Sequence, residues 1–101
     1  MTFDIQSYLS KHKQLIKECL SDEVTIDIFD KEFHKLFRDT RANDITPEIY
    51  QILERIMDLI YAFEPDEKIR KANSDYIGES QLREELKKAL DELEKLIKTT
   101  N

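Results

Sequence analysis

The stretch Phe63-Glu64-Pro65-Asp66 ends an apolar helical pattern and places a proline between two carboxylates. Proline has no amide hydrogen to donate and its ring clashes with the preceding turn, so we predict that a helix stops here. Upstream, Thr46-Pro47-Glu48 combines a capping hydroxyl, a proline at the first helical position and an acid in the first turn. These are the residues of a helix start. The sequence therefore predicts a helix from about residue 46 to residue 63, followed by a rigid corner.

This predicted helix has an apolar face and an acidic one. Its apolar residues recur every three or four positions: Ile49, Ile52, Leu53, Ile56, Ile60 and Phe63. At 100° per residue, Glu54, Asp58 and Tyr61 fall within about 60° of one another on the opposite side. We expect these three residues to form an exposed ridge that leads to the corner. Three further apolar residues lie partly off the core stripe: Tyr50, Met57 and Leu59. The pattern allows three roles for them, contacts with a partner, contacts in a dimer, or packing at the rim of the core.

Three other segments share the helical period. The first extends from about Asp4 to Leu20, with apolar or packing positions at Ile5, Tyr8, Leu9, His12, Leu15, Ile16, Cys19 and Leu20. The second follows Thr25 as its expected cap, with Ile28, Phe29, Phe33, Leu36 and Phe37 on the core face. The third follows Ser80 as its expected cap, with Leu82, Leu86, Ala89, Leu90, Leu93 and Ile97 on the core face.

Residues 64–79 have no such period, and we expect Gly78, the only glycine, to serve a turn there. Four amphipathic helices with short connections predict an all-α fold, an antiparallel four-helix bundle. A length of 101 residues is typical of one domain, so we expect residues 1–101 to form a single domain.

The net charge of −6 is concentrated in one segment. Residues 39–67 hold 8 acids and 2 bases, whereas the segments on either side are nearly balanced. A patch of one sign attracts a basic partner, and nucleic-acid binding requires the opposite sign. We therefore predict a basic protein partner and no direct binding of nucleic acid. The candidate binding residues surround the corner: Glu64, Asp66, Tyr61, Asp58, Glu54 and Glu67.

Several features indicate a protein of the cytoplasm. No window approaches the roughly 18 apolar residues of a membrane span. The start, Met1-Thr2-Phe3-Asp4, has neither the basic residues nor the apolar run of a signal peptide. The single cysteine, Cys19, has no second cysteine with which to form an internal disulfide. We expect a cytoplasmic location and no association with membranes.

The histidines and the cysteine do not form a metal-binding or nucleophilic pattern. His12 and Cys19 are two helical turns apart on one face, but a zinc site needs more ligands and His34 is on another helix. No basic cluster surrounds Cys19 to activate its thiol. We interpret His12 and Cys19 as packing residues.

The acids allow two catalytic interpretations, and neither is favoured. Pro65-Asp66 with Glu85-Leu86-Lys87 has the spacing of a metal-dependent nuclease motif, but two residues that are two apart on a helix point to different sides. Glu64 and Asp66 could form an acid–base pair, but no histidine or Gly-rich loop accompanies them. They could also be solvated loop acids. We predict no enzymatic activity, no catalytic residue, no metal and no cofactor.

Two parts of the sequence resemble the colicin D immunity protein family. One is Ala62-Phe63-Glu64-Pro65-Asp66, followed by Arg70 and Ala72-Asn73. The other is Val24-Thr25-Ile26, followed by Phe29, at the start of the second predicted helix. The resemblance covers most of the chain in layout and is specific over about residues 60–90.

The resemblance implies a small acidic four-helix bundle that inhibits a toxin. Such proteins bind the ribonuclease domain of a cognate bacterial toxin, which cleaves the anticodon loop of a transfer RNA. They cover its active-site cleft with carboxylates that stand where RNA phosphates would lie. The family's acids match Glu64 and Asp66, and its glutamate three residues before the first of these is Tyr61 here. The implied partner is a basic nuclease domain bound one-to-one, from a bacteriocin or from a contact-dependent-inhibition toxin. The alternative is an acidic helical adaptor that binds another basic protein.

Overall fold

The protein is all-helical, as its sequence predicts. The computed structural model describes residues 5–39 and 45–100, without the side chains of residues 5, 99 and 100. Its helices are α1 (Ile5–Leu20), α2 (Ile26–Asp39), α3 (Pro47–Ala62), α4 (Glu67–Ala72) and α5 (Glu79–Thr100). The described residues contain no strand, only one isolated bridge between Phe63 and Ile77. The expected start at Asp4 and the expected core position of the Ile5 side chain lie outside the described part.

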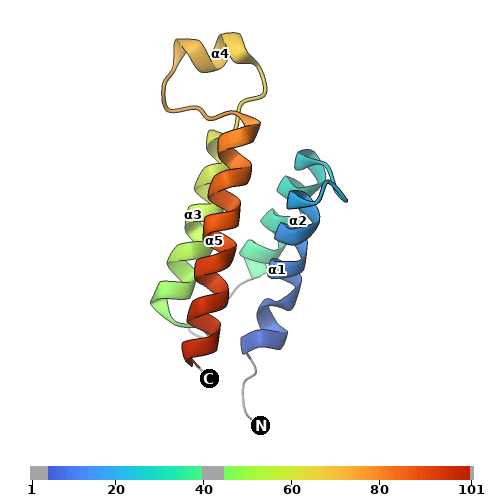
Figure 1. Cartoon of the computed structure of the whole chain (residues 1–101), viewed down its shortest axis with the longest axis vertical. Helices are drawn as coiled ribbons and strands as arrows, with labels where there is room; N and C mark the ends of the chain where they lie inside the picture. The colour runs from blue at the N-terminus through green and yellow to red at the C-terminus, as the bar shows by residue number, and fades with distance from the viewer. Residues whose placement is uncertain (1–4, 40–44, 101) are drawn as a thin grey trace.

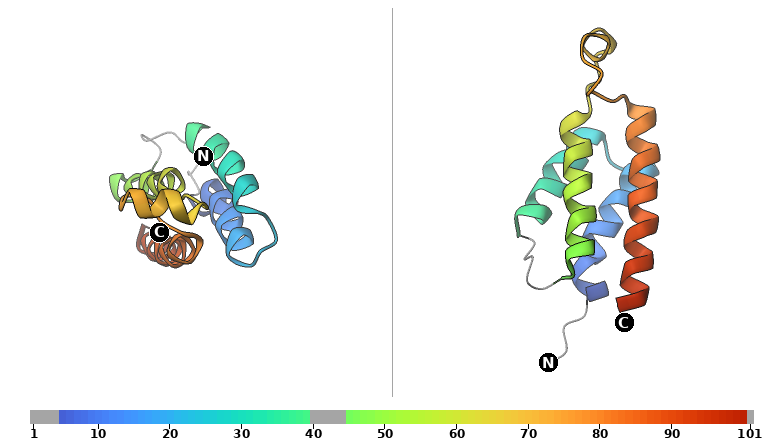
Figure 2. Two further views of the ribbon diagram at one scale, coloured as in Figure 1. Left: turned by 90° about the horizontal axis from the view of Figure 1, so that it is seen from above. Right: turned by 90° about the vertical axis from the view of Figure 1, so that its left-hand side faces the viewer.

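The four longer helices pack against one another in a ring of contacts. α3 contacts α5, α5 contacts α1, α1 contacts α2, and α2 contacts α3. Helices α3 and α5 lie side by side along most of their length and run in opposite directions, as do α1 and α2 (Figure 1). The molecule is elongated, 52 × 26 × 22 Å, because α4 lies beyond the end of α3 and α5 (Figures 1 and 2).

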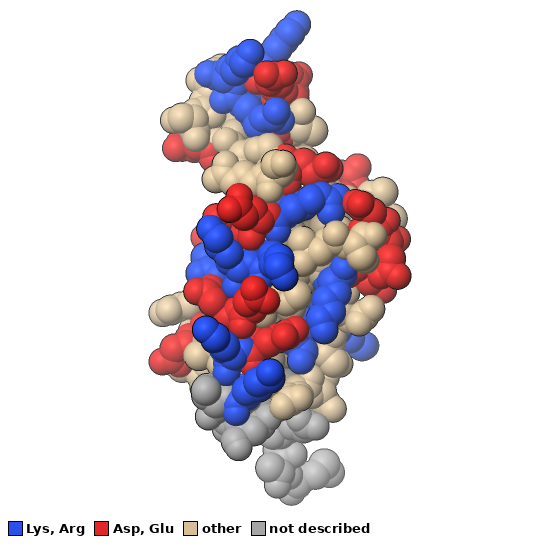
Figure 3. All heavy atoms as spheres, viewed as in Figure 1, with Lys and Arg blue, Asp and Glu red and all other residues tan. Residues whose placement is uncertain are grey.

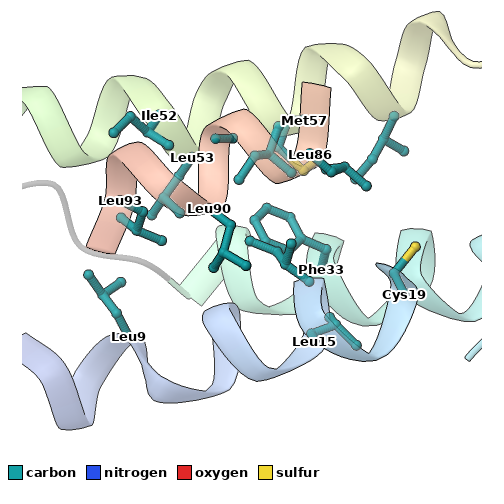
Figure 4. Close-up of a cluster of buried hydrophobic side chains, with 14 of the residues drawn as sticks. Leu9, Leu15, Cys19, Phe33, Ile52, Leu53, Met57, Leu86, Leu90 and Leu93 are labelled. Carbon is teal, nitrogen blue, oxygen red and sulfur yellow. The ribbon is translucent and has the colours of Figure 1, made fainter. Parts of the chain in front are cut away.

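The core lies between these four helices. Figure 4 shows Leu9 from α1, Phe33 from α2, Leu53 from α3 and Leu93 from α5 directed toward a common interior. The predicted apolar stripes of α3 and α5 are confirmed, except that Phe63 is only half-buried where it ends α3. On α3 and α5 the buried stripe residues are Ile49, Ile52, Leu53, Ile56 and Ile60, and Leu82, Leu86, Ala89, Leu90, Leu93 and Ile97.

The burial of two apolar residues, Ile28 and Met57, differs from the prediction. Ile28 is 48% exposed, because it lies about 100° around the helix from Phe29, off the face that Phe29 and Phe33 bury. Met57, expected partly off the core stripe, is buried, because α3 contacts both α2 and α5 and therefore buries a wider face. Tyr50 and Leu59 are half-buried against the core.

The start of α5 differs from the prediction. The helix begins at Glu79, and the amide of Leu82 donates to the carbonyl of Gly78 at 3.0 Å, so Ser80 lies inside the first turn and is not the cap. Gly78 has no positive φ. A Cβ added to it would lie 3.3 Å from Cζ of Arg70. Gly78 therefore lies close to an arginine side chain and does not adopt the left-handed conformation of a glycine turn.

Candidate protein-binding surface

Residues 64–77, which we call the hook, leave the end of α3 and return to the same place. The amide of Glu64 donates to the carbonyl of Ile77 at 3.0 Å, and the amide of Ile77 donates to the carbonyl of Ala62 at 2.8 Å. The hook therefore closes at its base by two backbone hydrogen bonds. Its middle forms α4, where the sequence alone predicts an irregular connection. Figure 1 shows the hook projecting away from the four packed helices.

Arg70 ties the two sides of the hook together from within. Its Nη1 donates to the backbone carbonyl of Glu64 at 2.5 Å in a partly buried position. On the other side, its guanidinium lies against Gly78, where a side chain would crowd it. Arg70 is therefore an internal support of the hook.

The two corner carboxylates are fixed by local hydrogen bonds. Oε1 of Glu64 accepts from the amide of Asp66 at 3.1 Å. Oδ1 of Asp66 accepts from the amide of Lys68 at 2.9 Å, which makes Asp66 the N-cap of α4. The second oxygen of each carboxylate has no hydrogen bond within the described part of the chain. Each acid thus holds the backbone with one oxygen and has the other available to a partner.

Glu67 has a weaker claim to a binding role. It pairs with Lys71 one turn along α4, with 3.4 Å between Oε1 and Nζ. Both side chains are largely exposed, so the pair contributes little to stability and can open for a partner.

The ridge lies along a groove between α2 and α3. Glu54, Asp58 and Tyr61 are all exposed, as predicted, and they line this groove together with Met57 and Arg38. Tyr61 is 66% exposed, the largest exposure among the large apolar and aromatic side chains of the described residues. The ridge ends at Tyr61, two residues before the corner.

Tyr61 is held in position by a residue that the sequence analysis did not select. Its hydroxyl lies 2.9 Å from Nε2 of His34, and the two rings meet edge to face with centroids 5.4 Å apart. Nδ1 of His34 lies 2.8 Å from the carboxylate of Asp30. These three residues form a chain across α2 and α3. No sequence signal identifies it, because His34 and Tyr61 are 27 positions apart.

The predicted packing role of His12 and Cys19 is confirmed. His12 is 4% exposed and meets the ring of Phe33 edge to face at 5.9 Å. Burial lowers the pKa of His12, and a backbone hydrogen bond with Leu36 opposes this shift. Cys19 is a buried free thiol whose pKa is raised by burial and lowered to a smaller extent by Arg83. A raised pKa disfavours the reactive thiolate.

The described residues offer little support for the nuclease motif. Glu85 pairs with Lys88 on α5, at 3.3 Å between Oε1 and Nζ. Within residues 5–39 and 45–100 no three His, Cys, Asp or Glu side chains are grouped as metal ligands. In the same residues no helix has the length and apolar character to cross a membrane.

Acidic and basic side chains alternate over the face on which α5 lies. Figure 3 shows both signs interspersed there and on the projecting α4. The acidic excess of residues 39–67 therefore does not dominate this face. The individual carboxylates fixed on the hook are more distinctive than the overall charge of this face.

The fold and the hook together define a small, acidic, all-helical protein with a projecting pair of fixed carboxylates. A family model described as "bacterial self-protective colicin-like immunity" matches residues 7–96. The match spans most of the sequence, and the chain belongs to this family of immunity proteins. Searches of curated proteins and of solved structures gave no match. Membership implies a cognate toxin as the partner and bears out the immunity-protein part of the resemblance.

Proposed function

We propose that the chain is an immunity protein of the colicin D type, which inhibits the transfer-RNA-cleaving domain of its cognate toxin. It acts in the cytoplasm, binds the toxin domain one-to-one and has no enzymatic activity of its own. The observation that carries this proposal is the pair of carboxylates, Glu64 and Asp66, fixed on a projecting hook in a chain of the immunity family.

The proposed mechanism is occlusion of a basic cleft. A ribonuclease must hold phosphates and therefore lines its cleft with arginine and lysine. Glu64 and Asp66 present carboxylate oxygens from a backbone that is already fixed, so little conformational freedom is lost on binding. Hydrogen bonds between a carboxylate and a guanidinium are charge-assisted and can be bidentate. The hook thus occupies the place of the RNA backbone.

The ridge extends the same proposed surface along α3. Glu54 and Asp58 supply further charge, Glu67 does so when it leaves Lys71, and Tyr61 supplies an exposed aromatic ring in a fixed orientation. Aromatic residues with little freedom to lose are typical anchors of protein interfaces. We propose that one domain, residues 1–101, forms an antiparallel four-helix bundle that supports this surface.

The proposal is tested with the nuclease domain of the toxin encoded beside this chain's gene. We would titrate the two proteins by calorimetry at two salt concentrations and follow transfer-RNA cleavage in the same mixtures. We expect tight binding that weakens with salt, and loss of cleavage at one-to-one stoichiometry.

Two variants that each replace a carboxylate with an uncharged amide of the same shape locate the site. Glu64→Gln and Asp66→Asn each retain an oxygen for the local hydrogen bond, and asparagine is as good a helix cap as aspartate. Asp91→Asn is the matched control, because Asp91 is an exposed acid on α5. Removing one partner of a buried charge pair costs about 2 kcal/mol or more, so Kd should rise about 30-fold or more in each corner variant.

Three results would contradict this proposal in different ways. If the double variant Glu64→Gln with Asp66→Asn bound as tightly as Asp91→Asn, the corner would not be the site. If the wild-type protein bound without stopping cleavage, occlusion of the active site would be wrong. If the wild-type protein failed to bind an active nuclease domain, an adaptor for another basic protein would become the better hypothesis.

A further inference from the structure

A hollow lies where the turn between α1 and α2 meets the base of the hook. Its apolar floor comes from two distant parts of the chain, Val24 and Ile26 on one side and Phe63 and Pro65 on the other. Pro65 is exposed and the other three are half-buried, so the floor is accessible. These are also the two parts that carry the family resemblance. The fold therefore joins them into one surface, which we call the end hollow.

The rim of the end hollow is acidic. Asp22, Asp27 and Glu79 line it, with Arg83 as the only base among its lining residues. Arg83 is already occupied, because its guanidinium pairs with Asp22, lies 3.8 Å from Glu79 and donates to the carbonyl of Cys19 at 2.8 Å. One base therefore faces three acids, which leaves the rim with two excess negative charges, and Asp27 is the acid that Arg83 does not pair with.

Asp27 has no ion pair within the described residues and is exposed to solvent. It lies in the first turn of α2, where the positive end of the helix dipole favours a carboxylate. Glu79 likewise lies in the first turn of its helix, α5. The fold therefore stabilises these acids without using the charge of Asp27 in a pair. A partner cation can use it.

We infer that the end hollow receives one arginine or lysine side chain of the toxin domain. The aliphatic part of that side chain would lie on the floor, and its cation would reach Asp27. An anionic group would be repelled by the rim, and an apolar group would leave the carboxylate of Asp27 buried without a partner, which is costly. Long basic side chains combine an apolar stem with a charged end, which matches both parts of this surface.

This inference rests on the proposed function and extends its surface. Pro65 belongs to both the hook and the end hollow, and Phe63 of the hollow immediately precedes the hook, so a toxin domain seated on the hook would contact the hollow as well. The contact surface would then include the turn between α1 and α2, which the acidic segment of residues 39–67 does not contain. A basic ribonuclease domain is the partner whose charge fits both regions.

The test compares two acids that occupy the same kind of position at opposite ends of the molecule. Asp27→Asn removes the first-turn acid of α2 beside the hollow. Glu48→Gln removes the exposed first-turn acid of α3, whose start lies at the other end (Figure 1). Both variants lose one charge and one favourable interaction with a helix dipole. Their melting temperatures should therefore fall by similar, small amounts.

Both variants are titrated against the same nuclease domain as the wild-type protein. We expect Kd to rise about tenfold for Asp27→Asn and less than about twofold for Glu48→Gln, with a larger loss for Asp27→Lys. Hydrogen exchange supplies a second measurement. The amides of residues 22–27 should become protected in the complex, together with those of the hook.

The possible failures are distinguishable. Equal values of Kd for Asp27→Asn and Glu48→Gln would overturn this inference and leave the proposed function standing, provided that both variants still stop cleavage. Protection confined to residues 64–77 would overturn it in the same way. Absence of binding by the wild-type protein would overturn the proposed function and this inference together.

Discussion

Truncation of Arg70 is expected to loosen the hook without unfolding the protein. The guanidinium of Arg70 donates to the carbonyl of Glu64. The amide of Glu64 in turn donates to the carbonyl of Ile77, which closes the base of the hook. α4 has no buried side chain, so few apolar contacts can replace this support. Arg70→Ala therefore removes the main side-chain connection across the hook.

The size of the effect follows from the type of bond. A hydrogen bond that involves a charged group contributes about 1.5–3 kcal/mol to stability. Because about 1.4 kcal/mol corresponds to a factor of ten, opening of the hook should become about 10- to 100-fold more favourable. The free energy of global unfolding should change by less than about 0.5 kcal/mol, because Arg70 lies outside the core.

Amide hydrogen exchange measures this opening directly. In Arg70→Ala, the amides of Glu64 and Ile77 should exchange about 10- to 100-fold faster, whereas amides in the middle of α3 and α5 should keep their wild-type rates. Lys71→Ala is the control on the same helix, because its exposed pair with Glu67 is worth about 0.3–0.5 kcal/mol. Unchanged exchange of Glu64 and Ile77 in Arg70→Ala would refute the supporting role of Arg70.

Three further predictions concern the core. Burial lowers the pKa of His12, so below about pH 6.5 the folded state binds fewer protons than the unfolded state. The free energy of unfolding should therefore fall as the pH decreases through this range. Urea titrations at several pH values should show a smaller fall for His12→Leu than for the wild-type protein. Cys19 is buried and its pKa is raised by burial, so its thiol should react slowly in the native protein. At pH 8 a thiol reagent should modify the native protein at least about 100 times more slowly than the urea-unfolded chain. Equal rates would mean that the thiol is accessible in the folded state. Phe33→Ala should cost about 3–5 kcal/mol in urea denaturation, because its ring is fully buried, whereas Ile28→Ala on the same helix should cost less than half as much.

The packed helices could be largely predicted from the sequence because their apolar faces follow the helical period. The spacing of Ile49, Leu53 and Ile56 identifies the buried face of α3, and Thr46-Pro47 identifies its start. Thr46 indeed caps the helix by accepting from the amide of Ile49 at 3.3 Å. Pro65 marks the end of the helix for an equally local reason, its missing amide hydrogen.

The exact burial of single residues could not be predicted, because it depends on how many neighbours a helix has. Met57 is buried because α3 packs against two helices, and Ile28 is exposed because the buried face of α2 does not extend to it. The close approach of Arg70 to Gly78 could not be predicted either, since it depends on how the hook folds back.

The sequence by itself determined the helical class, the position of the corner and the presence of acids around it, because periodicity, proline chemistry and charge are local properties. Only the tertiary structure decided that Tyr61 meets His34, that Arg70 meets the carbonyl of Glu64, and that Val24 and Ile26 line one hollow with Phe63. The first and third of these join residues that are far apart in the sequence and depend on the packing of the helices, whereas the second depends on closure of the hook. The physical reason is that helical spacing is set by residues close together in the sequence, whereas contacts between separate segments are set by how those segments pack.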